Sequence, residues 1–118
     1  MAREENAIVK QVHQWLALKR IRAWRVNTGG VPARGGRFKR NVAAGFPDLV
    51  CCCRGMFIAI EVKTPTGRQQ PSQKLFQQEL QAAGGVYILA RSLADVEAFF
   101  SNQITAKRFE AKEVKRGE

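Results

Sequence analysis

The 118-residue sequence predicts a single α/β domain in which a mixed central β-sheet is flanked by helices. Helical and strand-like patterns alternate along the chain, and hydrophobic residues make up 45% of it, as in an average globular domain. No apolar run approaches the roughly 18 residues of a membrane span, and the first residues lack the apolar stretch of a signal peptide. We therefore expect one packed core in a cytoplasmic protein.

The first half of the chain predicts a helix followed by three strands. Apolar residues at three- and four-residue spacing predict an amphipathic helix from Glu4 to Lys19. Aromatic and β-branched residues predict a short, half-buried strand from Ile21 to Val26. Two apolar runs, Asp48 to Cys53 and Phe57 to Lys63, flank a short turn sequence that contains Gly55, which predicts a β-hairpin.

The second half predicts a helix, a strand and a second helix. An apolar stripe from Ser72 to Ala83, preceded by turn residues and followed by two glycines, predicts a helix. Val86 to Ala90 has the composition of a buried strand, and Ser92 is a suitable N-cap for a helix that runs to Phe100. We expect the domain to cover residues 1–102 and residues 103–118 to form a basic C-terminal tail.

The charge balance predicts a polyanionic partner, with nucleic acid the leading candidate. Twenty Lys and Arg stand against ten Asp and Glu, and the net charge of +10 favours binding to phosphate backbones. Residues 27–46 lack periodicity and are rich in Gly, so we expect a long basic loop that is either a solvating segment or, as we favour, a grip on phosphates. The candidate DNA-binding residues are Arg34, Arg37, Lys39 and Arg40 in this loop, with Arg68 and Lys74 beyond it.

The large aromatic and sulfur-containing residues are predicted to be structural. Trp15 and Trp24 are expected in the core rather than as stacking platforms for bases. Cys51, Cys52 and Cys53 are consecutive, and with one His in the chain they suit neither a zinc site nor a disulfide framework. We expect them to act as small hydrophobic residues in a strand, with alternate sulfurs on opposite faces.

The few acids of this basic chain include two that the predicted hairpin brings together. If Arg54 and Gly55 form the turn, Asp48 lies opposite Glu61, with the two Cβ atoms about 5 Å apart. Lys63 shares this face, because residues two apart on a strand project from the same side. A three-residue turn would instead place Asp48 on the other face of the sheet.

Two facing carboxylates among apolar strands need a neutralising charge. Carboxylate oxygens without a cluster of thiolates or imidazoles suit Mg²⁺, with Mn²⁺ as a substitute. An ion held by Asp48 and Glu61 would support phosphodiester hydrolysis, with Lys63 holding the attacking water or stabilising the developing charge. The alternative is that these residues are exposed strand ends and a surface salt-bridge partner. Their order and setting favour an active site.

The motif Pro47-Asp48, followed by Glu61-Val62-Lys63, resembles the Pro-Asp…(Asp/Glu)-x-Lys nuclease superfamily. About residues 4–100 resemble, more closely, the VRR-NUC (virus-type replication-repair nuclease) family in its small stand-alone phage form. The resemblance implies a restriction-endonuclease-like core.

The same resemblance implies roles for individual residues. Asp48, Glu61 and the Val62 carbonyl would bind metal, and Lys63 and Gln73 would belong to the catalytic set. Glu5 would approach from the first helix as a further metal ligand, or Glu4 if the helical phase differs by one residue. For Glu5, complementing the helix dipole is an equal alternative, and for Gln73 a solvated helix position is nearly as good.

Small nucleases that resemble this family often act as homodimers on branched DNA. We therefore expect a Mg²⁺-dependent endodeoxyribonuclease, working in the cytoplasm of a bacterial or phage-infected cell, that resolves four-way (Holliday) junctions as a homodimer. The alternatives are a nuclease acting on plain duplex or flap DNA and a non-catalytic DNA-binding module.

Overall fold

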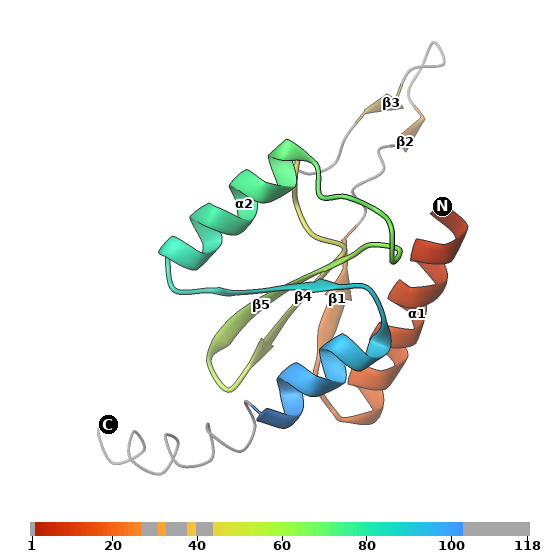
Figure 1. The fold of residues 1–118 in the computed structure, drawn as a ribbon. Coiled ribbons are helices and arrows are strands. Elements are labelled where there is room, and N and C mark those ends of the chain that lie inside the picture. Colours follow the sequence, from red (N-terminus) through yellow and green to blue (C-terminus); the bar gives the residue numbers. More distant parts are fainter. Residues whose placement is uncertain (1, 27–30, 33–37, 40–43, 103–118) are drawn as a thin grey trace.

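The computed structural model of the chain describes residues 2–26, 31–32, 38–39 and 44–102. All the predicted elements are present in the predicted order, with boundaries that differ from the predicted ones by no more than two residues (Figure 1). They are α1 Ala2–Leu18, β1 Ala23–Arg25, β4 Leu49–Cys53, β5 Met56–Val62, α2 Pro71–Ala82 and β6 Val86–Ala90, and residues 93–102 are helical. In the described part of the chain, no helix is both long and apolar enough to cross a bilayer.

The central sheet is mixed, as predicted. Its four strands lie in the order β1-β4-β5-β6. β4 pairs antiparallel with β1 and β5, whereas β6 runs parallel to β5, which it can do because α2 carries the chain back across the sheet. The predicted α/β fold class is confirmed.

The hairpin of β4 and β5 has a two-residue turn. Residues 54–55 both have positive φ angles, 53° and 83°, which is the conformation of a type I′ turn. At the open end of the hairpin, the last backbone pair is Leu49 with Ile60. The same register sets Asp48 opposite Glu61 one step further along, so the predicted turn is confirmed and a three-residue turn is excluded.

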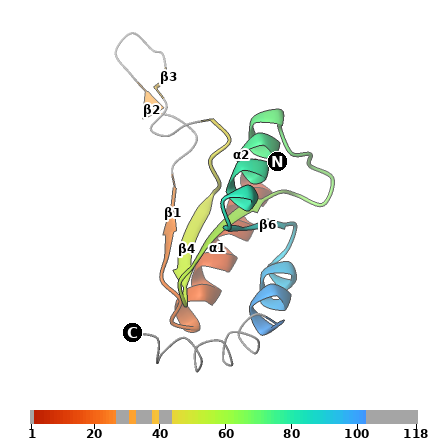
Figure 2. The same ribbon diagram turned by 90° about the vertical axis from the view of Figure 1, so that its left-hand side faces the viewer.

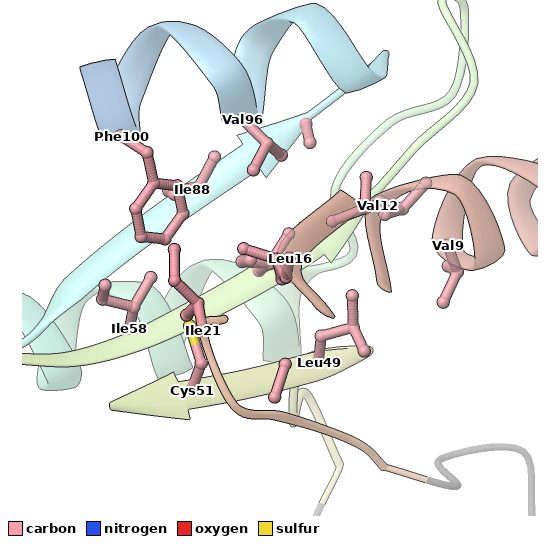
Figure 3. Close-up of a cluster of buried hydrophobic side chains, with 14 residues drawn as sticks. Val9, Val12, Leu16, Ile21, Leu49, Cys51, Ile58, Ile88, Val96 and Phe100 are labelled. Atoms are coloured by element: carbon pink, nitrogen blue, oxygen red, sulfur yellow. The ribbon is translucent and has the colours of Figure 1, made fainter. Parts of the chain in front are cut away.

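One face of the sheet carries the main hydrophobic core. α1 and the helix of residues 93–102 both cover this face, and Figure 3 shows Leu16 and Phe100, one from each helix, in the same cluster as Ile58 of β5. Cys51 is buried here, whereas Cys52 is exposed, so adjacent sulfurs lie on opposite faces as predicted. Trp15 packs against the same core, with its ring 6.0 Å from that of Phe100.

The opposite face is covered less completely, by α2. Phe76 of this helix contacts Phe46 and Tyr87, with ring centroids 5.2 and 6.3 Å apart. α2 lies against β6, at the opposite edge of the sheet from β1. Trp24 on β1 is therefore 49% exposed and Phe57 is 42% exposed. The prediction that Trp24 belongs to the core is wrong, because this face has a helix over only part of its width.

The predicted loop of residues 27–46 contains a second small sheet. β2 (Val31–Pro32) and β3 (Phe38–Lys39) pair antiparallel and stand apart from the main sheet in both views (Figures 1 and 2). The prediction of a loop without secondary structure is thus wrong at these residues. Runs of two residues are too short for any periodicity to show in the sequence.

The end of α1 is a tight turn that leads directly into β1. The N–H of Ile21 donates to the carbonyl of Leu16 at 2.8 Å, and the N–H of Arg20 donates to that of Ala17 at 3.0 Å. This pair of bonds is a Schellman motif, in which the residue after the helix adopts a left-handed conformation. Arg20 occupies that position with a φ of 62°.

Candidate active site

Asp48 lies at the open end of the β4–β5 hairpin and closes it with its side chain. Its Oδ2 accepts a hydrogen bond of 2.8 Å from the backbone N–H of Val62, so the carboxylate takes the place of a backbone carbonyl in the ladder. Its own carbonyl accepts a 2.8 Å bond from the N–H of Val26, which follows β1. Asp48 is therefore held from both neighbouring strands.

Glu61 is the most buried charged residue of the site, with 4% of its surface exposed. Its Oε2 accepts a 2.8 Å hydrogen bond from Nε2 of Gln73 and lies 3.8 Å from Nζ of Lys63. Its Oε1 is buried and has no hydrogen-bond partner within the described residues. A buried carboxylate oxygen without a donor is costly, so this atom has the character of an unfilled ligand position.

Gln73 links the start of α2 to the buried carboxylate. Its Oε1 accepts a 2.8 Å bond from the backbone N–H of Gln70, as in a capping box, while its amide group donates to Glu61. Gly45 makes this position possible: it has a φ of 88°, and a Cβ there would lie 2.7 Å from the carbonyl carbon of Ser72. The family resemblance implied that Gln73 lies beside the site, and in the structure it contacts Glu61 directly.

Burial raises the pKa values of both carboxyl groups. The pKa of Glu61 rises to about 8, chiefly through desolvation and then through the negative charge of Asp48, and Lys63 only partly opposes this. The pKa of Asp48 also rises, with desolvation as the main cause. The two carboxylates repel each other when both are ionised, and a divalent cation bound between them would offset this repulsion.

Glu5 lies close enough to affect both carboxyl groups, since its charge raises the pKa of Asp48 and of Glu61. Glu5 is half-buried and Glu4 is exposed. The helical phase therefore turns Glu5 rather than Glu4 towards the site. Within the described residues, however, no three His, Cys, Asp or Glu side chains come close enough to share an ion. A direct role for Glu5 as a ligand stays a prediction.

The backbone at and after Lys63 is fixed by hydrogen bonds to residues 90 and 91, and the sequence analysis did not predict them. The guanidinium of Arg91 donates from Nη1 to the carbonyls of Thr64 and Gly67, at 2.6 and 2.7 Å. The N–H of Lys63 donates to the carbonyl of Ala90 at 2.9 Å. Parallel strands end at the same edge of a sheet, so Arg91, directly after β6, could have been found from its place after that strand.

The structure places only some of the remaining predicted site residues. Val62 gives its N–H to Asp48, while its side chain is fully buried in the core on the other face. Arg68 and Lys74 are exposed. The predicted phosphate grip cannot be placed: Arg34, Arg37 and Arg40 are outside the described residues, and only the backbone of Lys39 is described. Their roles stay predictions.

The chain is similar to known proteins in sequence and in fold. The sequence model of the VRR-NUC domain matches residues 3–94. A solved structure described as a VRR_NUC domain is similar in fold, with a TM-score of 0.61 and 18% identity over 83% of this chain and 95% of that chain. No curated protein in the comparison matches the chain. A VRR-NUC domain implies nuclease chemistry, for which facing carboxylates beside a lysine are a suitable set. The chain therefore belongs to the VRR-NUC domain family, and its function is of the nuclease type.

Proposed function

We propose that the protein is a Mg²⁺-dependent endonuclease that hydrolyses phosphodiester bonds in DNA, with Mn²⁺ as a working substitute. The observation that carries this proposal is the buried Oε1 of Glu61, which has no partner within the described residues and belongs to a carboxylate set opposite Asp48. Hard oxygen ligands of this kind fit Mg²⁺, which keeps several waters and accepts phosphate oxygens.

Each residue of the site has a distinct part in this proposal. Asp48 and Glu61 hold the cation, with the Val62 carbonyl and Glu5 as further ligands. When bound, the cation polarises the scissile phosphate and lowers the pKa of a bound water. Lys63, with its Nζ 3.8 Å from Oε2 of Glu61, orients the attacking water or stabilises charge on the phosphoryl oxygens. Gln73 fixes the rotamer of Glu61 through its 2.8 Å bond.

The proposed substrate is branched DNA, in particular the four-way junction, cut by a homodimer. One chain of 118 residues carries one set of facing carboxylates in its described part, whereas resolving a junction takes two cuts. A two-fold dimer supplies two such sets in a fixed relation.

The test compares site variants on a panel of four-way junction, flap and linear duplex DNA with Mg²⁺ or Mn²⁺. Asp48→Asn and Lys63→Ala should each lower the cleavage rate by roughly a thousandfold or more, while DNA affinity stays within a few fold of wild type. Glu79→Gln removes an exposed carboxylate on α2 and is the matched control, which should cleave normally.

The panel also separates the proposal from its alternatives. Faster cleavage of linear duplex or flap DNA than of the junction would contradict the branched substrate and leave the nuclease in place. Tight DNA binding without cleavage by the wild-type protein, with either metal, would contradict the nuclease and leave a DNA-binding module.

A further inference from the structure

The seam between α1 and β1 is hollowed along its length by three connected cavities. The central one has a volume of about 520 Å³ and shares His13 and Ala17 with a cavity of about 360 Å³ at one end. It shares Arg20, Ile21 and Arg22 with a cavity of about 410 Å³ at the other end. Because neighbouring cavities have lining residues in common, they form one continuous depression, which we name the α1–β1 groove.

The α1–β1 groove is strongly basic. No Asp or Glu is among its lining residues in the described part of the chain. The cations that line it come from α1, from the turn into β1, from β1 itself and from the β4–β5 turn, and they are Lys10, Lys19, Arg20, Arg22, Arg25 and Arg54. Uncompensated charge in a concave surface focuses the field and attracts an anionic partner.

Several of these cations are held in place by the fold. Arg25 donates from Nη2 to Oδ1 of Asn6 at 2.9 Å. The guanidinium of Arg22 lies over the ring of Trp24, 5.6 Å from its centroid. Such contacts reduce the rotamer freedom that a cation loses when it binds a ligand. Trp24, which is exposed and lies outside the core, thus helps to position Arg22.

One end of the groove meets the candidate active site. Arg25 pairs with Leu49 and directly precedes Val26, whose N–H donates to the carbonyl of Asp48 at 2.8 Å. The other end reaches Arg54 at the turn of the β4–β5 hairpin. From Arg20 to Arg25 the chain spans up to roughly 16 Å if extended. Measured along the DNA helix axis, this length corresponds to about four or five base-pair steps.

We propose that the α1–β1 groove binds the sugar–phosphate backbone of the DNA strand on one side of the scissile phosphate. The inference rests on the proposed function, because the carboxylates at the end of the groove define which phosphate is cut. An acidic protein segment would match the charge, but the position of Arg25 on the strand paired with β4, next to Asp48, favours the substrate itself. The contacts are to phosphate, so they contribute affinity and orientation rather than sequence preference.

The first experiment neutralises the groove in protein that binds but does not cut. In a Lys63→Ala background, Arg20→Gln, Arg22→Gln and Arg54→Gln are combined, and the affinity for fluorescein-labelled junction DNA is measured across a salt series. The dissociation constant should rise by roughly tenfold or more, and the slope of log K against log salt should become shallower by about 2 to 3.

A charge-matched control separates position from net charge. Lys112→Gln, Lys115→Gln and Arg116→Gln remove the same charge from residues of the C-terminal segment, outside the described part of the chain. Equal loss of affinity in both triple variants would show that binding follows net charge, and it would overturn the proposal.

The second experiment does not depend on the triple variant folding. A thiol is introduced at an exposed position of the groove by Ala17→Cys and at an exposed position of α2 by Gln78→Cys, both in the Lys63→Ala background. Junction DNA should slow alkylation at position 17 at least severalfold and leave position 78 unchanged, as read by mass spectrometry of the labelled peptides. Equal alkylation rates at position 17 with and without saturating DNA would overturn the proposal.

The two proposals fail in different ways. Binding and protection are measured without catalysis, so absence of cleavage by the wild-type protein contradicts the nuclease and not the groove. Normal DNA affinity of the triple groove variant contradicts DNA binding by the groove, and it leaves the proposed nuclease activity untouched.

Discussion

Glu61 is an ionisable residue that is almost completely buried, and burial opposes its ionisation. Its carboxyl group has a pKa of about 8 in the folded chain, against 4.5 as the ordinary value. At a pH between these two values, the carboxyl group is therefore protonated in the folded state and ionised in the unfolded state. Because the folded state then binds more protons, the free energy of unfolding falls as the pH rises through this range.

Glu61→Gln should remove this pH dependence, because an amide does not titrate. Between a pH of about 5 and about 8, without divalent cations, the unfolding free energy of the wild type should fall more than that of the variant. Urea denaturation in the presence of a chelator measures both. The control is Glu79→Gln on the exposed face of α2, which should follow the wild type. Parallel curves for wild type and Glu61→Gln would contradict a raised pKa at this residue.

The position of α2 depends on the close approach of Gly45 to its first turn. A Cβ at this residue would meet the backbone of Ser72, which cannot rotate away as a side chain could, and the φ of 88° is also unfavourable for alanine. Gly45→Ala should therefore lower stability by about 2 kcal/mol or more and displace Gln73 from Glu61.

The measurement for Gly45→Ala is chemical denaturation together with cleavage at a temperature at which the variant is folded. The matched control is Gly55→Ala, where φ is 83° but a Cβ meets no atom within 4 Å. The control should show only the conformational cost of a left-handed alanine, of about 1 kcal/mol, with normal cleavage. Equal losses of stability and activity in both variants would contradict the close approach.

Elements that are fixed by local pattern could be predicted, and those that depend on distant packing could not. The turn at residues 54–55 sets the hairpin register locally, so the pairing of Asp48 with Glu61 followed from the sequence. The exposure of Trp24 did not follow, because it depends on how far α2 extends over the sheet. The bonds of Arg91 to carbonyls such as that of Thr64, about a quarter of the chain away, did not follow either, although its place directly after β6 indicated the edge of the sheet at which it lies.

At the scale of the whole molecule, the proposed homodimer has one site in each chain. Each site of a two-fold dimer should cut one strand of a junction. A dimer of one wild-type chain and one Lys63→Ala chain should therefore nick a single strand, whereas the wild-type dimer makes paired cuts. Mixed chains carrying two different affinity tags allow the mixed dimer to be isolated and its products counted on supercoiled cruciform DNA.

Paired cuts by the mixed dimer would contradict the proposal that each chain cuts one strand. A molar mass in solution that corresponds to one chain, together with junction cleavage, would contradict the dimer itself. The inactive dimer of two Lys63→Ala chains is the control for background nicking.

The two edges of the sheet differ in their protection against unwanted self-association. At one edge, Arg22 and Arg25 flank the exposed Trp24, and cations on an edge strand discourage other chains from adding to it. At the other edge, β6 reads Val-Tyr-Ile-Leu-Ala without a charge and, among the described strands, pairs only with β5. When the protein is heated or concentrated, we therefore expect aggregates to nucleate at β6.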